Sequence, residues 1–87
     1  MTEIEILEIL KSEEFGECFS GLYYRWEDEK AYENIKDYAI PIQDCFGLKI
    51  REMCSDPFGF IIETSTITLN VSIVFGDIQV TKSKIRS

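Results

Sequence analysis

The strongest pattern in the chain is an alternation of hydrophobic and polar side chains over residues 66–75. The hydrophobic members are Ile67, Leu69, Val71, Ile73 and Phe75, and the polar members are Thr66, Thr68, Asn70 and Ser72. Because successive side chains of a strand point to opposite faces, this pattern predicts a strand with one buried and one wet face. Such a strand needs neighbouring strands and a second layer to cover its hydrophobic face.

Shorter signals on both sides of this segment complete a sheet. Residues 48–53 alternate weakly, residues 55–59 have the composition of a turn, and residues 60–63 form a short hydrophobic run. Gly76 and Asp77 suit a two-residue hairpin turn that leads into a return strand over residues 78–82. The second half of the chain is therefore expected to form an antiparallel meander.

Helical signals dominate the first half. Thr2 and Glu5 have the spacing of a capping box and precede a hydrophobic stripe, which predicts a helix over 3–14. A second helix is expected over 28–39, where Ala31, Ile35 and Tyr38 recur at i, i+4 and i+7 and would face the core. Pro41 is expected to end that helix near Ala39 because it restricts the preceding residue.

Residues 17–26 fit two periods. A helix would align Phe15, Phe19, Leu22 and Trp26 on one side, whereas a strand would place Cys18, Leu22, Tyr24 and Trp26 on one face. Ser20 and Gly21 weaken a helix, so a strand is favoured. The fold class is then α+β: a single domain over residues 1–87, with two layers and N-terminal helices packed on one face of an antiparallel sheet of about four to five strands.

The net charge of −7 is unevenly distributed. Residues 1–44 hold twelve acids and four bases, a balance of −8, and residues 45–87 hold four acids and five bases, a balance of +1. A negative surface repels nucleic acid and anionic membranes, so neither is an expected partner, whereas a basic protein is. The longest uncharged run has 13 residues, too short to span a bilayer, and the acidic N-terminus is unlike a secretory signal. We therefore expect a cytoplasmic protein.

Residue types that carry chemistry are scarce. The chain has no histidine, and its three cysteines, at positions 18, 45 and 54, are widely spaced. They are expected to be free thiols packed as small hydrophobic residues in a reducing compartment. Without a nucleophile paired with a base, a metal-ligand cluster or a glycine-rich phosphate loop, we expect no enzyme activity, no cofactor and no metal.

The segment from 23 to 38, YYRWEDEKAYENIKDY, mixes aromatic and acidic side chains. On a helix, Glu29, Glu33 and Asp37 would form a ridge of carboxylates about 6 Å apart with Tyr32 beside it. Together with Tyr23 and Trp26 this set of residues is the predicted partner-binding site. The alternative interpretation is an ordinary solvated helix face, with acids that favour the helix start.

These features predict a non-catalytic acidic domain that binds the basic, nucleic-acid-binding surface of another protein. By analogy of charge and size, inhibitors and immunity proteins are such a class, and phage anti-restriction and anti-CRISPR proteins belong to it. The alternative is a structural subunit that forms homo-oligomers through an edge or the open face of its sheet.

Overall fold

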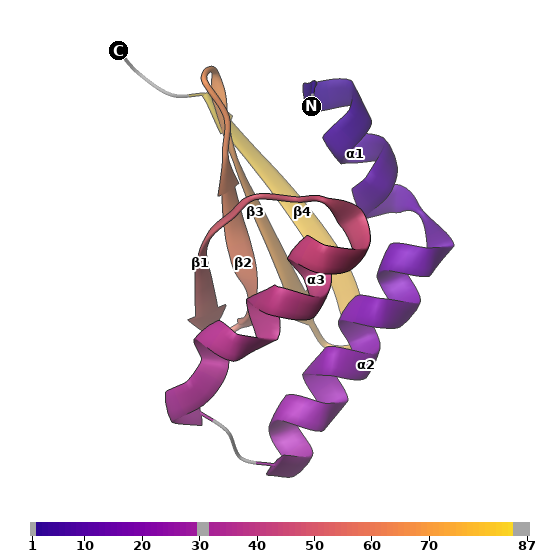
Figure 1. The fold of residues 1–87 in the computed structure, drawn as a ribbon, viewed down its shortest axis with the longest axis vertical. Coiled ribbons are helices and arrows are strands. Elements are labelled where there is room, and N and C mark those ends of the chain that lie inside the picture. Colours follow the sequence, from indigo (N-terminus) through magenta and orange to yellow (C-terminus); the bar gives the residue numbers. More distant parts are fainter. Residues whose placement is uncertain (1, 30–31, 85–87) are drawn as a thin grey trace.

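The computed structural model describes residues 2–29 and 32–84 and shows an antiparallel sheet with helices packed on one face (Figure 1). The helical elements are α1 (Glu3–Lys11), α2 (Glu13–Glu29), the 3-10 helix η1 (Tyr32–Tyr38) and α3 (Ala39–Phe46). The strands are β1 (Ile50–Ser55), β2 (Phe58–Glu63), β3 (Ile67–Val74) and β4 (Asp77–Lys84), in the sheet order β1-β2-β3-β4. The predicted two-layer α+β class and the antiparallel meander are confirmed.

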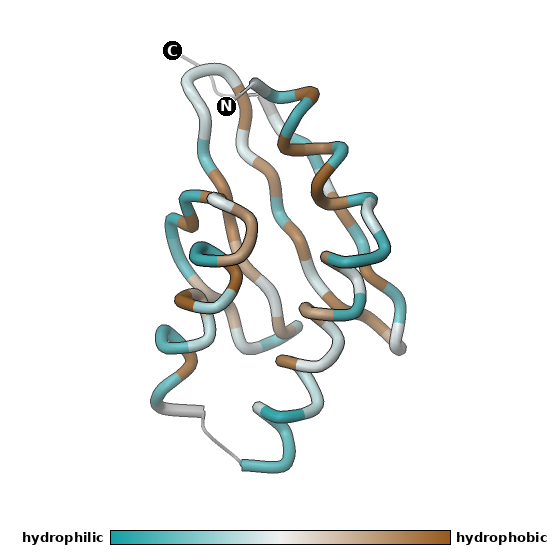
Figure 2. Tube along the Cα trace, turned by 45° about the vertical axis from the view of Figure 1, so that its right-hand side comes forward, coloured by the Kyte–Doolittle hydropathy of each residue, from teal (hydrophilic) through white to brown (hydrophobic). Residues whose placement is uncertain are grey.

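The alternation in β3 orients the sheet. Its hydrophobic residues are buried, and the polar residues between them are exposed or half-buried. Val71 lies opposite Phe60 and Leu69 opposite Ile62 across the β2–β3 pair. Hydrophobic residues recur along the strands and along the N-terminal helix in Figure 2. The hydrophobic side of the sheet therefore faces the helices and forms the core with them.

The hairpin turns differ from those predicted. The turn between β3 and β4 is Phe75–Gly76, because Val74 already pairs with Asp77. Both turn residues have positive φ, 52° at Phe75 and 81° at Gly76, as a type I′ turn requires. Phe75 is fully exposed and does not continue the buried side of the strand. The β1–β2 turn is shorter than the predicted 55–59, since β2 begins at Phe58.

The first helix is shorter than the predicted 3–14. Its capping box at Thr2 and Glu5 is present, but α1 ends at Lys11 and Ser12 is extended. The Ser12 N–H donates to the carbonyl of Ile9, and the Ser12 hydroxyl accepts from the N–H of Phe15. One serine thus ends α1 and caps α2, and the chain bends between the two helices.

The strand favoured over 17–26 is wrong, because this segment lies inside α2. The segment is helical because a helix places its large hydrophobic side chains on one side. Phe15, Phe19, Leu22 and Trp26 are all buried in the core. Gly21 is on the exposed side of α2, where a missing side chain costs only about 1 kcal/mol. Burial of four large side chains outweighs that cost.

The single helix over 28–39 is also wrong. Glu29 is the last residue of α2, and the chain resumes in η1, with a kink at Asn34. Pro41 does not end a helix. It lies in the first turn of α3, where no intrahelical N–H donor is needed. Tyr38 is buried and Ile35 half-buried, whereas Ala31 lies outside the described residues.

The core draws on both layers. Its buried members are Ile6, Leu10, Phe15, Phe19, Leu22, Trp26, Tyr38, Ile42, Leu48, Phe58, Phe60, Ile62, Ile67, Leu69, Val71 and Ile73. Within the described part of the chain no polar or charged side chain is buried. None of the helices described is both long enough and apolar enough to cross a membrane.

Two glycines offer a matched test of this packing. A Cβ on Gly59 would lie 2.0 Å from the carbonyl oxygen of Val71, whereas a Cβ on Gly21 would meet nothing within 4 Å. We expect Gly59→Ala to destabilise the fold by about 3 kcal/mol or more, because β2 and β3 must separate. Gly21→Ala should stabilise it by about 0.5–1 kcal/mol, because alanine favours helix. Urea unfolding of both variants measures the difference, and equal midpoints would contradict this close strand pairing.

Candidate protein-binding surface

The predicted ridge of Glu29, Glu33 and Asp37 does not lie on one helix. Glu29 belongs to α2, whereas Glu33 and Asp37 belong to η1, a separate 3-10 helix. The backbone of Tyr32 is also in η1, and the side chains of Tyr32 and Glu33 lie outside the described part. The three acids therefore do not share the single helix that the prediction assumed.

In the structure Glu29 instead accepts hydrogen bonds from one basic and one phenolic side chain. Arg25 Nε donates to Glu29 Oε1 at 3.0 Å, and the Tyr38 hydroxyl donates to Glu29 Oε2 at 2.9 Å. These hydrogen bonds, the one from Arg25 first, lower the pKa of Glu29. Burial, followed by the hydrogen bond to Glu29, raises the pKa of Tyr38. Glu29 is thus ionised and Tyr38 protonated at neutral pH, and the pair connects α2 to η1.

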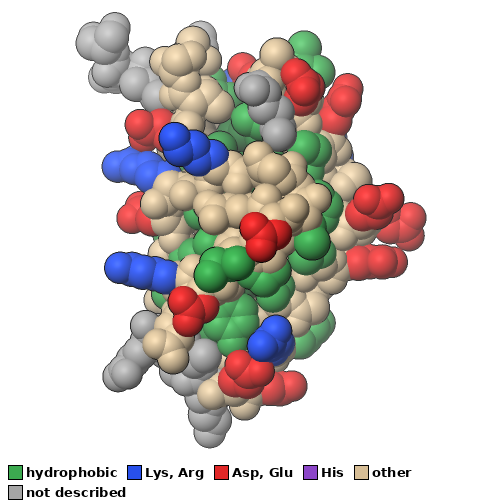
Figure 3. Space-filling view, in the orientation of Figure 1, with side chains coloured by type: hydrophobic (Ala, Val, Ile, Leu, Met, Phe, Trp, Pro, Cys, Tyr) green, Lys and Arg blue, Asp and Glu red, His purple; other side chains and the backbone are tan. Residues whose placement is uncertain are grey.

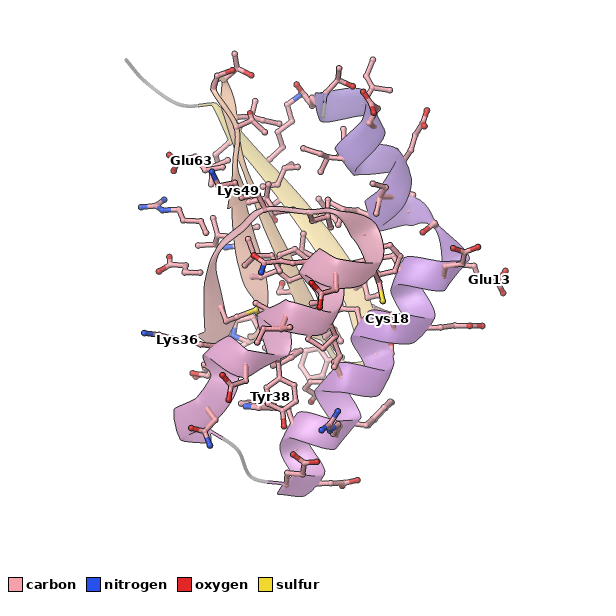
Figure 4. All side chains as sticks on the ribbon, in the orientation of Figure 1. Glu13, Cys18, Lys36, Tyr38, Lys49 and Glu63 are labelled. Carbon is pink, nitrogen blue, oxygen red and sulfur yellow. The ribbon has the colours of Figure 1, made fainter. Side chains whose placement is uncertain are left out.

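A hollow of about 310 Å³ lies beside this network, between α2 and the η1–α3 segment. Figure 4 shows Tyr38 in front of the sheet, between η1 and the C-terminal part of α2. Glu29 and Asp37 both line the hollow, with Arg25 and Asn34. The structure therefore brings two predicted residues together, but from different elements.

The two predicted aromatic contacts have different surroundings. Trp26 is 5% exposed, and its ring centroid lies 4.9 Å from that of Phe58, so it is a core residue. Tyr23 is half-buried, and its hydroxyl donates to Glu27 Oε1 at 2.7 Å. Tyr24, which was not among the predicted site residues, is 60% exposed. If the segment had been assigned a helical period, Tyr24 would have been predicted to lie on the exposed side of the helix.

The net charge is concentrated on the N-terminal helices. Residues 1–29 hold nine acids and two bases, a balance of −7, and residues 30–87 hold seven of each. In Figure 3 a group of acidic side chains projects from the margin formed by α1 and α2, whereas acidic and basic side chains alternate along the opposite margin. Glu13, at the start of α2, points away from the body in Figure 4. Residues 1–29 therefore account for the net charge of the chain, because the acids and bases of residues 30–87 cancel.

The exposed side of α2 forms a ridge, which we call the α2 ridge: Glu13, Glu17, Tyr24 and Asp28. At 100° per residue these four positions fall within an arc of about 60°, opposite the buried stripe, and span about 22 Å along the axis. Tyr24 lies between the acids as an exposed aromatic ring. The predicted combination of carboxylates and an aromatic residue thus exists, at other positions.

A second acidic feature lies where α1 and α2 meet. Glu5, Glu8 and Glu14 line a hollow of about 390 Å³ together with Ile9 and Phe46. We call it the bend hollow. Backbone and side-chain hydrogen bonds from Thr2 lower the pKa of Glu5, so this carboxylate is ionised at neutral pH. Carboxylates around a hydrophobic floor match the chemistry of a lysine or arginine side chain, with its aliphatic stem and charged end.

The cysteines are free thiols in three environments. Cys18 and Cys54 are half-buried, and burial raises the pKa of each thiol, so both are protonated at neutral pH. Cys45 is exposed, contrary to the expectation that every cysteine is packed. In the described residues no group of three or more Cys, Asp or Glu side chains is placed to hold a metal ion.

Comparison with protein-family models, with characterised proteins and with solved structures finds no match to this chain. The function must therefore be argued from the charge and shape of the surface.

The Glu29 network gives a pH prediction. A carboxylate with a lowered folded-state pKa stabilises the fold above the ordinary glutamate pKa of about 4.3. That contribution is lost as the pH falls through the folded-state pKa. Glu29→Gln should therefore lower the thermal midpoint at pH 7, and its difference from the wild type should disappear toward pH 3. Tyr38→Phe, which removes one donor and leaves the carboxylate, serves as the comparison. A Glu29→Gln difference that is independent of pH would contradict this assignment.

Proposed function

We propose that this protein is a non-catalytic binding domain that covers a basic surface of a partner protein. The observation that carries the proposal is the charge partition: the balance of −7 in residues 1–29 equals that of the whole chain. Eight of the nine acids are exposed on α1 and α2, and the ninth, Glu3, forms an ion pair with Lys82 of β4. A fold that only needed solubility could distribute these charges over its whole surface.

The concentrated negative charge indicates which kind of partner the protein would bind. Concentrated negative charge attracts a positive surface at long range, accelerates encounter and orients the two molecules. The most extended basic surfaces on proteins are those that bind nucleic acid, because they must neutralise phosphates. An inhibitor or immunity protein that occupies the nucleic-acid groove of an enzyme is the concrete form of this proposal.

The α2 ridge supplies contact geometry as well as charge. Glu13 and Glu17 lie one turn apart, about 6 Å along the helix axis, and Asp28 lies about 16 Å beyond Glu17. Tyr24 contributes a rigid ring with a polar tip, the kind of side chain that is enriched in interfaces. The bend hollow offers a recess beside the ridge for a basic side chain.

A second candidate, self-association through the sheet edge, has one observation in its favour. β4 pairs only with β3 in the described sheet, so one edge of this eight-residue strand is open. Val80 on this strand is 38% exposed. Pairing with a second copy would satisfy the open backbone groups, although Lys82 on the same strand disfavours it. Strand pairing persists in high salt, whereas charge steering is screened.

Charge reversal tests the proposal. Glu8→Lys, Glu17→Lys and Asp28→Lys alter the bend hollow and the α2 ridge at exposed positions, and within the described residues none of the three makes a hydrogen bond or ion pair. We expect the triple variant to fold and to lose, by about tenfold or more, the capture of basic proteins from lysate. Wild-type capture should decline with salt, and competing duplex DNA should displace the captured proteins.

The matched control reverses three exposed acids elsewhere: Asp37→Lys, Asp44→Lys and Glu52→Lys. Each variant reverses three acids, so the net charge of both changes by the same six units. A difference between them therefore reports the location of the charge and not the net charge. The control should retain capture. Equal loss in both variants would show an effect of net charge alone, and loss only in the control would place the contact on the η1 and β1 side.

A further inference from the structure

The end of the molecule opposite the N-terminus carries a fully exposed aromatic residue in an unfavourable backbone conformation. Phe75 is 100% exposed and has a φ of 52°. The left-handed region is uncommon for residues other than glycine, asparagine and aspartate, and a bulky residue there is an outlier. The first central position of a type I′ turn favours asparagine, aspartate or glycine. Phe75 therefore costs the fold conformational energy and contributes no hydrophobic burial in return.

Phe75 lines a hollow of about 310 Å³ at this end. The hollow lies between the two hairpin turns and the C-terminal half of α2, which contribute Pro57, Phe75 and Tyr23 respectively. Its base is an aromatic cluster in which the ring of Phe58 lies 5.7 Å from Tyr23 and 4.9 Å from Trp26. We call this site the aromatic end. Its base belongs to the core, since Phe58 and Trp26 are both buried.

Two carboxylates, Glu27 and Asp56, also line the hollow, and among the residues that the structure describes no lysine or arginine lines it. Glu27 uses one oxygen to accept from Tyr23, and both acids are exposed. An uncharged hydrophobic segment would remove water from these carboxylates without a compensating hydrogen bond, which is unfavourable. A cation would pair with the carboxylates and lie against the rings. The charge of the hollow thus selects a basic occupant.

Arginine fits this combination better than lysine. Its guanidinium is planar, so it stacks on an aromatic face and presents a fork of donors to a carboxylate. The ammonium of lysine is a compact and strongly hydrated charge that does not stack. Because Phe75, Glu27 and Asp56 line the same hollow, it contains both an aromatic ring and carboxylates for one arginine side chain.

We propose that the aromatic end is a docking site for an arginine side chain of the partner protein, with Phe75 as the ring that covers it. The inference rests on the proposed function, since it takes the partner to be basic, and it names the side chain that the partner inserts. The energetic cost of Phe75 is then explained by binding, because an exposed strained residue commonly marks a functional position.

The only tryptophan of the chain reports on this site. Trp26 lines the hollow and contacts Phe58, so its fluorescence should respond to an occupant. We expect the peptide acetyl-Arg-Arg-Arg-Arg-amide, titrated at low salt, to produce a saturable change in that fluorescence. Tetra-lysine of the same length should bind about threefold more weakly, because it provides charge without stacking.

Phe75→Asn is the decisive variant. It removes the ring, keeps the net charge and creates Asn-Gly, the preferred pair for a type I′ turn, so it should fold at least as stably as the wild type. We expect it to bind tetra-arginine about fivefold more weakly. Asp56→Asn, which removes one carboxylate, should weaken binding by a similar factor.

Three outcomes would overturn this proposal: no saturable response in the wild type, equal binding by Phe75→Asn, or equal binding of the two peptides. The peptide titration needs no captured partner, so the two proposals fail separately. A peptide response with no capture of basic proteins would refute the proposed function alone. Intact capture with an unaltered Phe75→Asn titration would refute the arginine site alone.

Discussion

Packing between the aromatic side chains of α2 and those of β2 organises this structure. Phe15 and Phe19 from the helix meet Phe58 and Phe60 from the strand, and all four are at most 1% exposed. The Phe19 centroid lies 5.3 Å from that of Phe60 and 5.6 Å from that of Phe58. Each such pair contributes about 0.5–1.5 kcal/mol beyond the burial of its area. The contact fixes the rotation of α2 on the sheet.

That rotation determines which residues face solvent. With the phenylalanine stripe toward β2, the α2 ridge must point away from the sheet. The same packing places Tyr23 and Trp26 over the β1–β2 turn, next to the turn that carries Phe75. The two proposed binding surfaces are therefore consequences of one interface, and a change in the stripe would disturb both.

The overall architecture could be predicted correctly from the sequence. The helices of the first half of the chain could be predicted less accurately. The alternation in β3 is unambiguous, since no helix period matches it, and it requires a sheet with a covering layer. The choice over 17–26 failed because propensity was given more weight than the four-residue hydrophobic stripe. Ser12 followed by Glu13 and Glu14 is a helix-start signal that marks the bend, and it lies inside a segment that was predicted to be one helix.

The site was harder to predict for a related reason. Once α2 extends to Glu29, the positions that share its exposed side change, and Tyr24 replaces Tyr32 as the aromatic residue among acids. The acidic and aromatic composition of the segment was visible, but its period decides which residues are adjacent. Phe75 shows more clearly what a sequence pattern cannot predict. As the last hydrophobic residue of an alternating strand it fits the buried face.

Only the register of the β3–β4 pair places Phe75 in the turn, one residue beyond the strand. A one-residue shift of register moves a side chain from one face of a sheet to the other, so a hairpin turn is sensitive to it. The register is set by pairs such as Ile73 with Ile78 and Val71 with Val80, which lie on the helix-facing side. The core thus holds Phe75 in a conformation that its own residue type disfavours. A turn backbone that is held in one conformation before binding has less conformational entropy to lose when a partner binds it.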